Sequence, residues 1–238
     1  MNRLHEALLL DALGTLVALE PPAPRLRRAL SSGFGISISE SEAERAIAAE
    51  IAYYRSHLDE GRDEATLATL RRACAQVMGA ALPNEARASL DPDALVSVLL
   101  RSLEFSVFDD VRPSLRQLRG RGLRLVVVSN WDVSLTDVLR RMDLTPLLDG
   151  IVTSAGAGAR KPTAAIFERA LRLAGASPGR AAHVGDGLVE DVEGARAAGI
   201  EPIFLRRDGG SGPPRVKTIE SLTELAAAIE EQPQVTEP

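Results

Sequence analysis

The sequence predicts an α/β fold, in which a doubly wound parallel sheet is interrupted near its start by a helical insertion. Two observations predict the sheet. Apolar runs alternate with helical patterns in the second half of the chain, and one further apolar run, at residues 6–12, stands alone and needs strands to pair with. A third observation predicts the insertion, because residues 25–104 show helical patterns and no strand. We therefore expect a core domain of residues 1–18 and 106–238 and a helical cap domain of residues 19–105.

The first strand and the insertion come first along the chain. The run at residues 6–12, EALLLDA, holds an unbroken apolar stretch that ends at the carboxylate of Asp11, and Gly14 follows soon after. This pattern is typical of a buried strand that runs into a loop. The segment EPPAP then breaks the chain. Apolar stripes at helical spacing predict the helices of the insertion at residues 43–58, 66–82 and 91–103.

The remaining elements alternate between strand and helix. Strands are predicted at residues 123–130, 149–155, 181–186 and 200–205. Helices are predicted at residues 113–120, 133–142, 163–174, 189–198 and 218–230. The strands read as unbroken apolar runs, which indicates parallel strands that helices cover on both faces.

Composition limits the class of protein. With 238 residues, 45% of them hydrophobic, the chain can bury a sizeable core. Its net charge of −5 argues against nucleic acid as a partner, because no basic field would attract phosphate backbones. The single cysteine, Cys74, excludes an internal disulfide framework and suits a reducing compartment. Since the N-terminal apolar stretch is too short for a membrane span and Asp11 interrupts it, we expect a cytoplasmic protein without a membrane partner.

Polar side chains follow the ends of several predicted strands. Asp11 follows the first apolar run, Ser129 and Asn130 follow the second, and Asp186 closes a later one. Lys161 follows the loop after the strand at 149–155. Because ligands of open parallel sheets bind beyond the carboxyl ends of the strands, we expect these side chains to share one crevice.

The chemistry of these side chains is coherent. Asp11 and Asp186, with Asp191 nearby, can hold a hard cation such as Mg²⁺ through oxygen ligands. A lysine and a hydroxyl opposite them can neutralise a phosphoryl group, and a free carboxylate can attack it covalently. The turn at Gly14 and Thr15 lets backbone N–H groups approach an anion. We therefore expect a small phosphorylated substrate and Mg²⁺ as the cofactor.

Four strings in this order resemble the motifs of the haloacid dehalogenase (HAD) superfamily of hydrolases, in the branch whose helical cap follows the first motif. They are DALGTLV at 11–17, VVVSN at 126–130, KPTAAIF at 161–167 and GDGLVEDVEGARAAG at 185–199. The resemblance implies a Rossmann-like core with an inserted cap, and a hydrolase of phosphatase type.

The resemblance also implies roles at the reacting centre. Asp11 would be the nucleophile that forms an aspartyl intermediate, and Ser129 and Lys161 would bind the transferring group. Asn130 would orient the substrate or the Asp11 loop. Trp131, the only tryptophan, directly follows these residues and would either line the pocket or pack the loop.

The metal site and the missing acid form the second part of the resemblance. Mg²⁺ would be held by Asp11, Asp186 and the backbone carbonyl of Leu13, with Asp191 supporting it directly or through water. HAD phosphatases usually read DxDGT, and the second Asp protonates the leaving group and then activates water. Here Leu13 occupies that position, and the absent proton transfer is worth about 10²–10⁴-fold in rate.

Two alternatives to a phosphatase remain open. The 2-haloacid dehalogenases also lack the second Asp, but they resemble this chain less, because they lack the equivalent of Asp186 and carry a tyrosine where this chain has Phe167. The other alternative is a HAD homologue that binds Mg²⁺ or a phosphorylated ligand and has lost turnover. The sequence predicts neither the substrate nor the oligomeric state.

Overall fold

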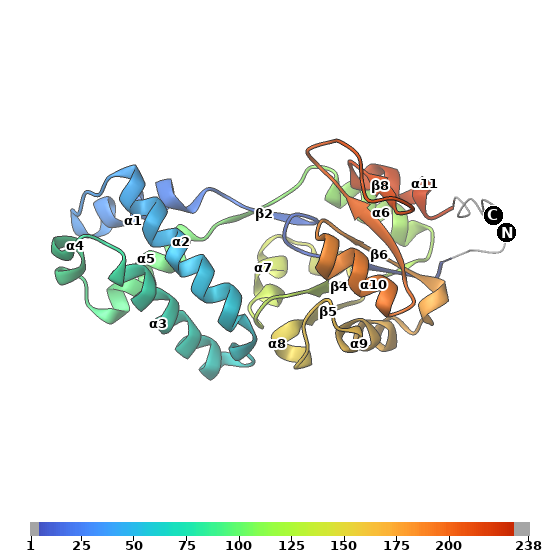
Figure 1. The fold of residues 1–238 in the computed structure, drawn as a ribbon, viewed down its shortest axis with the longest axis horizontal. Helices are drawn as coiled ribbons and strands as arrows, with labels where there is room; N and C mark the ends of the chain where they lie inside the picture. The colour runs from blue at the N-terminus through green and yellow to red at the C-terminus, as the bar shows by residue number, and fades with distance from the viewer. Residues whose placement is uncertain (1–4, 231–238) are drawn as a thin grey trace. The chain divides into compact units, whose positions relative to one another are not determined.

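The computed structural model describes residues 5–230, and its main feature is a six-stranded parallel sheet (Figure 1). The ends of the predicted core domain at 1–4 and 231–238 lie outside the described residues. The strands are β1 (Ala7–Leu10), β4 (Arg124–Ser129), β5 (Gly150–Thr153), β6 (Ala181–Gly185), β7 (Glu201–Leu205) and β8 (Lys217–Ile219). Their order is β5–β4–β1–β6–β7–β8, and every pair is parallel, which confirms the predicted fold class.

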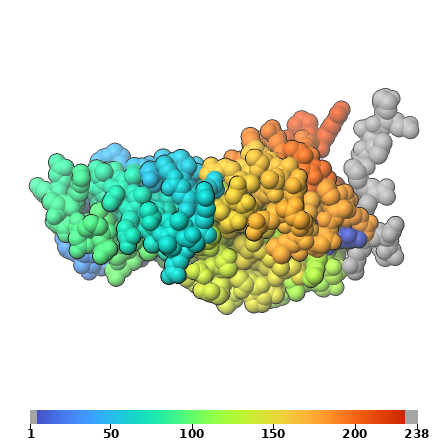
Figure 2. All heavy atoms as spheres, turned by 90° about the horizontal axis from the view of Figure 1, so that it is seen from below, coloured from blue at the N-terminus to red at the C-terminus, as the bar shows by residue number. Residues whose placement is uncertain are grey.

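Helices cover both faces of this sheet. The helices of this unit are α6 (Val111–Gly120), α7 (Leu135–Arg141), α8 (Ser154–Ala157), α9 (Ala164–Ala174), α10 (Gly194–Ala197) and α11 (Leu225–Ala228). On one face, alternate residues of β1 and β4 such as Leu9 and Val126 pack with Phe167 and Ala170 of α9. Helix α6 covers β4 on the opposite face (Figure 1). The outer side of α9 exposes Glu168, Arg169 and Arg172 together with Leu173. The helix contributes to the surface that is drawn as amber spheres in Figure 2.

The end of the chain differs from the prediction. A single helix at 218–230 is wrong, because the structure has β8, a short 3₁₀ turn at η5 (Leu222–Glu224) and the four-residue α11 there. β8 pairs with β7 and extends the sheet by one edge strand. A three-residue edge strand has too few alternating residues to show a period in the sequence.

A second unit consists of helices. Its elements are α1 (Pro22–Phe34), α2 (Glu40–His57), η1 (Leu58–Glu60), α3 (Glu64–Ala80), α4 (Asn84–Ala88) and α5 (Pro92–Ser102). The prolines predicted to break the chain instead begin α1, because proline is accommodated in the first turn of a helix. Ser39 and Glu42 cap α2 reciprocally, and Asp91 caps α5.

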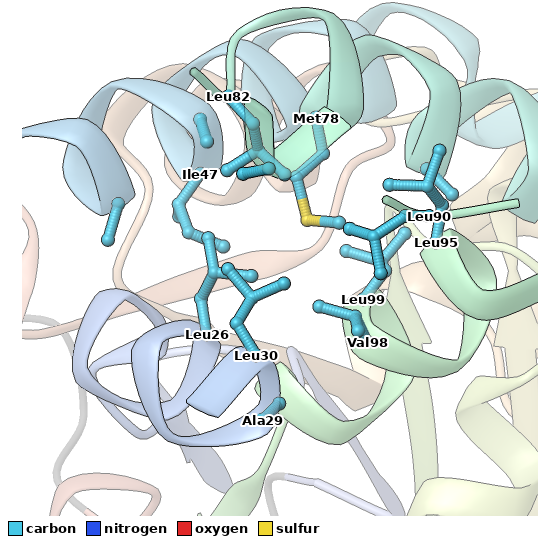
Figure 3. Close-up of a cluster of buried hydrophobic side chains, with 14 of the residues drawn as sticks. Leu26, Ala29, Leu30, Ile47, Met78, Leu82, Leu90, Leu95, Val98 and Leu99 are labelled. Carbon is cyan, nitrogen blue, oxygen red and sulfur yellow. The ribbon is translucent and has the colours of Figure 1, made fainter. Parts of the chain in front are cut away.

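The helical unit has its own apolar core. Side chains from α1, α2, α3 and α5 point toward one another around Met78 (Figure 3). The labelled members are Leu26, Ala29, Leu30, Ile47, Met78, Leu82, Leu90, Leu95, Val98 and Leu99. This cluster shares no residue with the cluster that packs on the sheet, so each unit buries its own apolar surface.

The two units are made of different stretches of the chain. One unit comprises the chain up to Ala18, then Val107–Asn130 and the chain from Leu135 onward. The helical unit comprises Leu19–Ser106 and also Trp131–Ser134, a segment that we expected in the core. The strands β2 (Val17–Leu19) and β3 (Phe105–Val107), which were not predicted, form a small two-stranded sheet where the chain passes from one unit to the other.

Candidate active site

The three central strands of the sheet deliver the predicted side chains to one edge. β1 lies between β4 and β6, and Leu10 pairs with Val127 on one side and Val184 on the other. Asp11 continues β1, Ser129 ends β4, and Asp186 follows β6. Because the strands are parallel and in this register, their carboxyl ends bring the three residues together, as predicted.

Asp11 is buried and held through one of its two carboxylate oxygens. The Ser129 hydroxyl donates to Asp11 Oδ1 at 2.9 Å, and Lys161 Nζ donates to the same oxygen at 2.6 Å. Both hydrogen bonds therefore fix the same oxygen of the carboxylate.

Lys161 joins two carboxylates. The residue is only 3% exposed, and its ammonium group also donates to Asp191 Oδ1 at 2.5 Å. The Asn130 amide holds the Lys161 backbone at both ends, because Nδ2 donates to the Lys161 carbonyl at 3.0 Å and Oδ1 accepts from the Lys161 N–H at 2.8 Å. Asn130 thus orients Lys161, a role that the sequence did not suggest.

Asp191 accepts three hydrogen bonds. In addition to Lys161, His183 Nε2 lies 2.8 Å from Oδ1, and the Gly187 N–H donates to Oδ2 at 2.8 Å. Asp191 is carried by a π-helical segment, η4 (Leu188–Glu193), where the sequence predicted an ordinary helix at 189–198. A Cβ atom at Gly185 would overlap the Asp191 carboxylate, so the glycine before Asp186 makes room for this arrangement.

Protonation follows from this geometry. Although burial lowers the pKa of Lys161, the two carboxylates outweigh it and raise that pKa above its usual value. Burial raises the pKa of Asp11, repulsion from Asp191 adds to this, and Lys161 and Ser129 oppose it. Burial also acts to raise the pKa of Asp191, but Lys161 and His183 outweigh it, so that pKa lies below its usual value. Lys161 is therefore a cation and Asp191 an anion near neutral pH.

Asp11, Asp186 and Asp191 form a cluster of carboxylates whose oxygens lie within 4.8 Å of one another. The Asp186 residue as a whole is exposed, but its carboxyl group faces the two buried acids. Desolvation of that group and repulsion from Asp11 and Asp191 raise its pKa to about 6. Three oxygen donors that repel one another are the ligand set that a hard divalent cation such as Mg²⁺ prefers.

The turn after Asp11 lies against this cluster. Ala12 O accepts the N–H groups of Thr15, Leu16 and Val17, which folds residues 12–17 into a tight turn. Gly14 adopts φ +81°, and a Cβ atom there would overlap the Asp186 carboxylate. Leu13 is 41% exposed, so the position of the missing acid is open to solvent.

Trp131 follows Asn130 directly, and the helix predicted at 133–142 is observed as α7, which begins at Leu135. Within the helical unit, the Trp131 ring lies 5.2 Å from that of Phe105. Asp132 Oδ1 accepts the Ser134 N–H at 2.7 Å, and α7 begins one residue later. Tyr54 donates to Asp132 Oδ2 at 3.0 Å.

Two supporting residues were missed by sequence reasoning. His183 lies within the strand predicted at 181–186; it is fully buried, and it contacts Asp191. Arg207, which lies beyond β7, contacts the backbone of the Gly14–Thr15 turn. The sequence carries no signal for Arg207, because its partners in the turn are backbone carbonyl groups, which do not depend on residue type.

The fold and the site together define a Rossmann-like α/β enzyme with a buried carboxylate, a lysine and an acidic cluster at one sheet edge. The model of the haloacid dehalogenase-like hydrolases matches residues 5–199, and the chain belongs to this family.

Curated relatives match parts of the chain. Haloacid dehalogenase-like hydrolase domain-containing protein 3 of Homo sapiens is 43% identical over 101 residues, 42% of this chain and 40% of that protein. Glyceraldehyde 3-phosphate phosphatase of Methanothermobacter thermautotrophicus is 33% identical over 119 residues, 48% of this chain and 53% of that protein. The chain thus spans about half of the length of these relatives or less.

Solved structures match nearly the whole chain. A HAD phosphatase from Thermococcus onnurineus aligns with a TM-score of 0.67 and 26% identity over 96% of this chain and 99% of that one. A 2-haloacid dehalogenase from Pseudomonas syringae aligns with a TM-score of 0.67 and 22% identity over 94% of this chain and 98% of that one, a likeness of fold alone. No helix among residues 5–230 has both the length and the apolar character that a membrane crossing needs.

Proposed function

We propose that this chain is a Mg²⁺-dependent hydrolase of phosphatase type that forms an aspartyl-phosphate at Asp11. The observation that carries the proposal is the cluster of Asp11, Asp186 and Asp191 beside the Lys161 ammonium group. A negative cluster next to one buried cation fits a divalent metal ion together with a phosphoryl group.

Asp11, Asp186 and the Leu13 backbone carbonyl would hold Mg²⁺, which when bound neutralises phosphoryl oxygens during transfer. Asp191 already accepts hydrogen bonds from Lys161, His183 and the Gly187 N–H. We therefore assign Asp191 to the support of a metal-bound water and of Lys161, rather than to direct ligation.

The chain's own residues then account for the transfer. An Asp11 carboxylate oxygen attacks phosphorus, the bond from phosphorus to the leaving oxygen breaks, and the leaving group departs with the electron pair. Ser129 and Lys161 bind the transferring group. The N–H groups of Gly14 and Thr15 donate to the Val17 and Ala12 carbonyls, so these two residues would contribute by shaping the turn beside the transferring group. Water then attacks the phosphorus of the aspartyl-phosphate, which releases phosphate and restores the Asp11 carboxylate. Asn130 keeps Lys161 in place, and Trp131 would contribute to substrate binding.

The substrate class follows from Leu13. A leucine donates no proton, so a leaving group must depart as a stable anion. Acyl phosphates and phosphoanhydrides have such leaving groups, and we propose one of these as the substrate, with phosphomonoesters turned over slowly. The helical unit would act as the cap that selects it.

Relatives support a small phosphorylated substrate. Some are named glyceraldehyde 3-phosphate phosphatase and ribulose-1,5-bisphosphate 5-phosphatase. A dehalogenase is the second candidate, because Leu13 replaces the acid that halide release does not need. Against it stand Asp186 in the carboxylate cluster and Phe167, which is fully buried against His183 and has no hydroxyl to offer.

The test compares two substrate panels in the presence and absence of EDTA. We expect phosphate release from acetyl phosphate or a phosphoanhydride that EDTA suppresses and Asp11→Asn abolishes. Activity that persists in EDTA would contradict the phosphatase proposal. Metal-independent halide release from 2-haloacids would establish the dehalogenase instead. Mg²⁺ binding without turnover on either panel would identify a homologue that only binds.

A further inference from the structure

We propose that Arg207 is a positioning residue of this site, which holds the Gly14–Thr15 turn where the metal and the phosphoryl group bind. The inference rests on the proposed function, because the turn matters only if it supports that chemistry. Arg207 belongs to none of the motifs that the sequence revealed.

The contacts of Arg207 converge on the turn. Nε donates to the Gly14 carbonyl at 3.1 Å, and Nη2 donates to the Thr15 carbonyl at 2.7 Å. These two carbonyls belong to consecutive residues, so one rigid guanidinium group fixes the orientation of both peptide units. A lysine has a single ammonium group, so it would reach both carbonyls only by giving up the ion pair with Asp110.

Arg207 is itself held firmly. Its guanidinium group forms a two-point ion pair with Asp110, at 2.9 Å from Nη1 to Oδ2 and 3.1 Å from Nη2 to Oδ1. It also lies over the Phe108 ring, with 3.9 Å from Cζ to the ring centroid. Asp110 in turn accepts hydrogen bonds from the Ser221 hydroxyl and the Leu222 N–H, so Arg207 has little freedom to move away from the turn.

The turn transmits this restraint to the reacting groups. Gly14 lies so close to the Asp186 carboxylate that no Cβ atom fits between them. The carbonyl of Leu13 joins the same peptide unit as the Gly14 N–H, so the orientation of that unit depends on the turn. Fixing Gly14 and Thr15 therefore fixes two of the proposed metal ligands, the Leu13 carbonyl and Asp186.

Two variants of Arg207 and one matched control test the inference. Arg207→Lys keeps the positive charge but removes the planar guanidinium group with its several N–H donors. Arg207→Met removes both the charge and the donors. Arg206→Met is the control, because Arg206 is the preceding residue and its side chain donates to Asp208 and to the Ser211 carbonyl of its own loop rather than to the Gly14–Thr15 turn.

The first measurement is amide hydrogen exchange of the full chain without metal. We expect exchange in residues 12–17 to rise about tenfold or more in both Arg207 variants, with the rest of the sheet unchanged and the control like wild type. Unchanged exchange in residues 12–17, or a rise throughout the protein, would overturn the inference.

The second measurement is calorimetric titration with Mg²⁺ alone. We expect the dissociation constant to rise about tenfold in Arg207→Lys as well as in Arg207→Met, the lower end of the 10–100-fold that outer partners of metal sites typically contribute to affinity. An affinity in Arg207→Lys equal to that of wild type would show that only the charge matters and would overturn the positioning role. If wild type binds no Mg²⁺, the metal part of the proposed function fails, and the exchange experiment still decides whether Arg207 holds the turn.

Discussion

Gly14 packs directly on the carboxylate of Asp186, with no room between them for even a methyl group. The two residues come from loops that follow neighbouring strands, and Gly14 has φ +81°, which L-residues rarely adopt. The close approach brings the backbone of the DALGTLV motif to Asp186 of the GDGLVEDVEGARAAG motif. The shape of the site therefore depends on position 14 being a glycine, which has no side chain.

Gly14→Ala tests this close approach. We expect it to weaken Mg²⁺ binding by at least about tenfold, because the new methyl group must displace Asp186, and to destabilise the fold by more than the roughly 1–2 kcal/mol of positive-φ strain alone. Calorimetric titration and urea unfolding measure the two effects. Gly175→Ala is the matched control, since Gly175 has φ +66° and nothing within 4 Å of its missing Cβ. Equal losses in both variants would show that strain, and not contact with Asp186, is responsible.

Lys161→Met is expected to destabilise the protein strongly. The change leaves Asp11 and Asp191 buried near each other without a cation, and removing one partner of a buried ion pair typically costs about 3–5 kcal/mol. Urea unfolding at neutral pH measures the loss. Lys217→Met changes the only other lysine, which pairs with the more exposed Glu201 and donates to the Ala228 carbonyl. It should cost clearly less, because it does not leave two buried carboxylates facing each other. A similar cost for both lysines would refute the view that Lys161 compensates two buried charges.

The sequence was sufficient to predict five of the six strands of the sheet and the side chains that follow its central strands. Long apolar runs and a carboxylate after β1 are local features, and their meeting at one edge follows from parallel pairing. The partners of those side chains could not be predicted in this way. Asn130 binds the backbone of Lys161, 31 residues away, and His183 reaches Asp191 only because η4 turns back toward β6.

Three short strands could not be predicted from the sequence for a related reason. β2, β3 and β8 have three residues each, too few to show a period, and their partners are far away in the sequence. Residues 131–134 were assigned to the core because they directly follow β4, yet Val133 bonds to Gly61 and Asp132 to Tyr54. Those contacts are long-range, and local pattern does not contain them.

The buried carboxyl group of Glu50 should make the stability of the protein depend on pH. Glu50 lies on α2, is 4% exposed, and burial raises the pKa of its carboxyl group above 4.5, although a hydrogen bond with Cys74 opposes this. Since the folded state holds this proton more tightly than the unfolded state, its contribution to stability is full below the unfolded pKa of 4.5 and decreases as pH rises through the folded value.

We therefore expect Glu50→Gln to match wild type near pH 4 and to be more stable than wild type at pH 8. Between the two pKa values, the difference in unfolding free energy should grow by no more than about 1.4 kcal/mol per pH unit. Urea unfolding across this range measures it. Glu44→Gln is a control on the exposed side of the same helix. A constant difference between Glu50→Gln and wild type at all pH values would show that Glu50 does not titrate abnormally.

Leu13→Asp restores the acid that phosphatases of this family usually carry. Because Leu13 is 41% exposed, an aspartate fits there without being buried. We expect kcat/KM for a sugar phosphate to rise by about 10²–10⁴-fold, because its alkoxide leaving group needs a proton, and to change little for acetyl phosphate, whose leaving group does not. Leu13→Asn is the matched control, since an amide of the same shape transfers no proton at neutral pH. If Leu13→Asp gains nothing over Leu13→Asn on the sugar phosphate, proton transfer is not what limits this site.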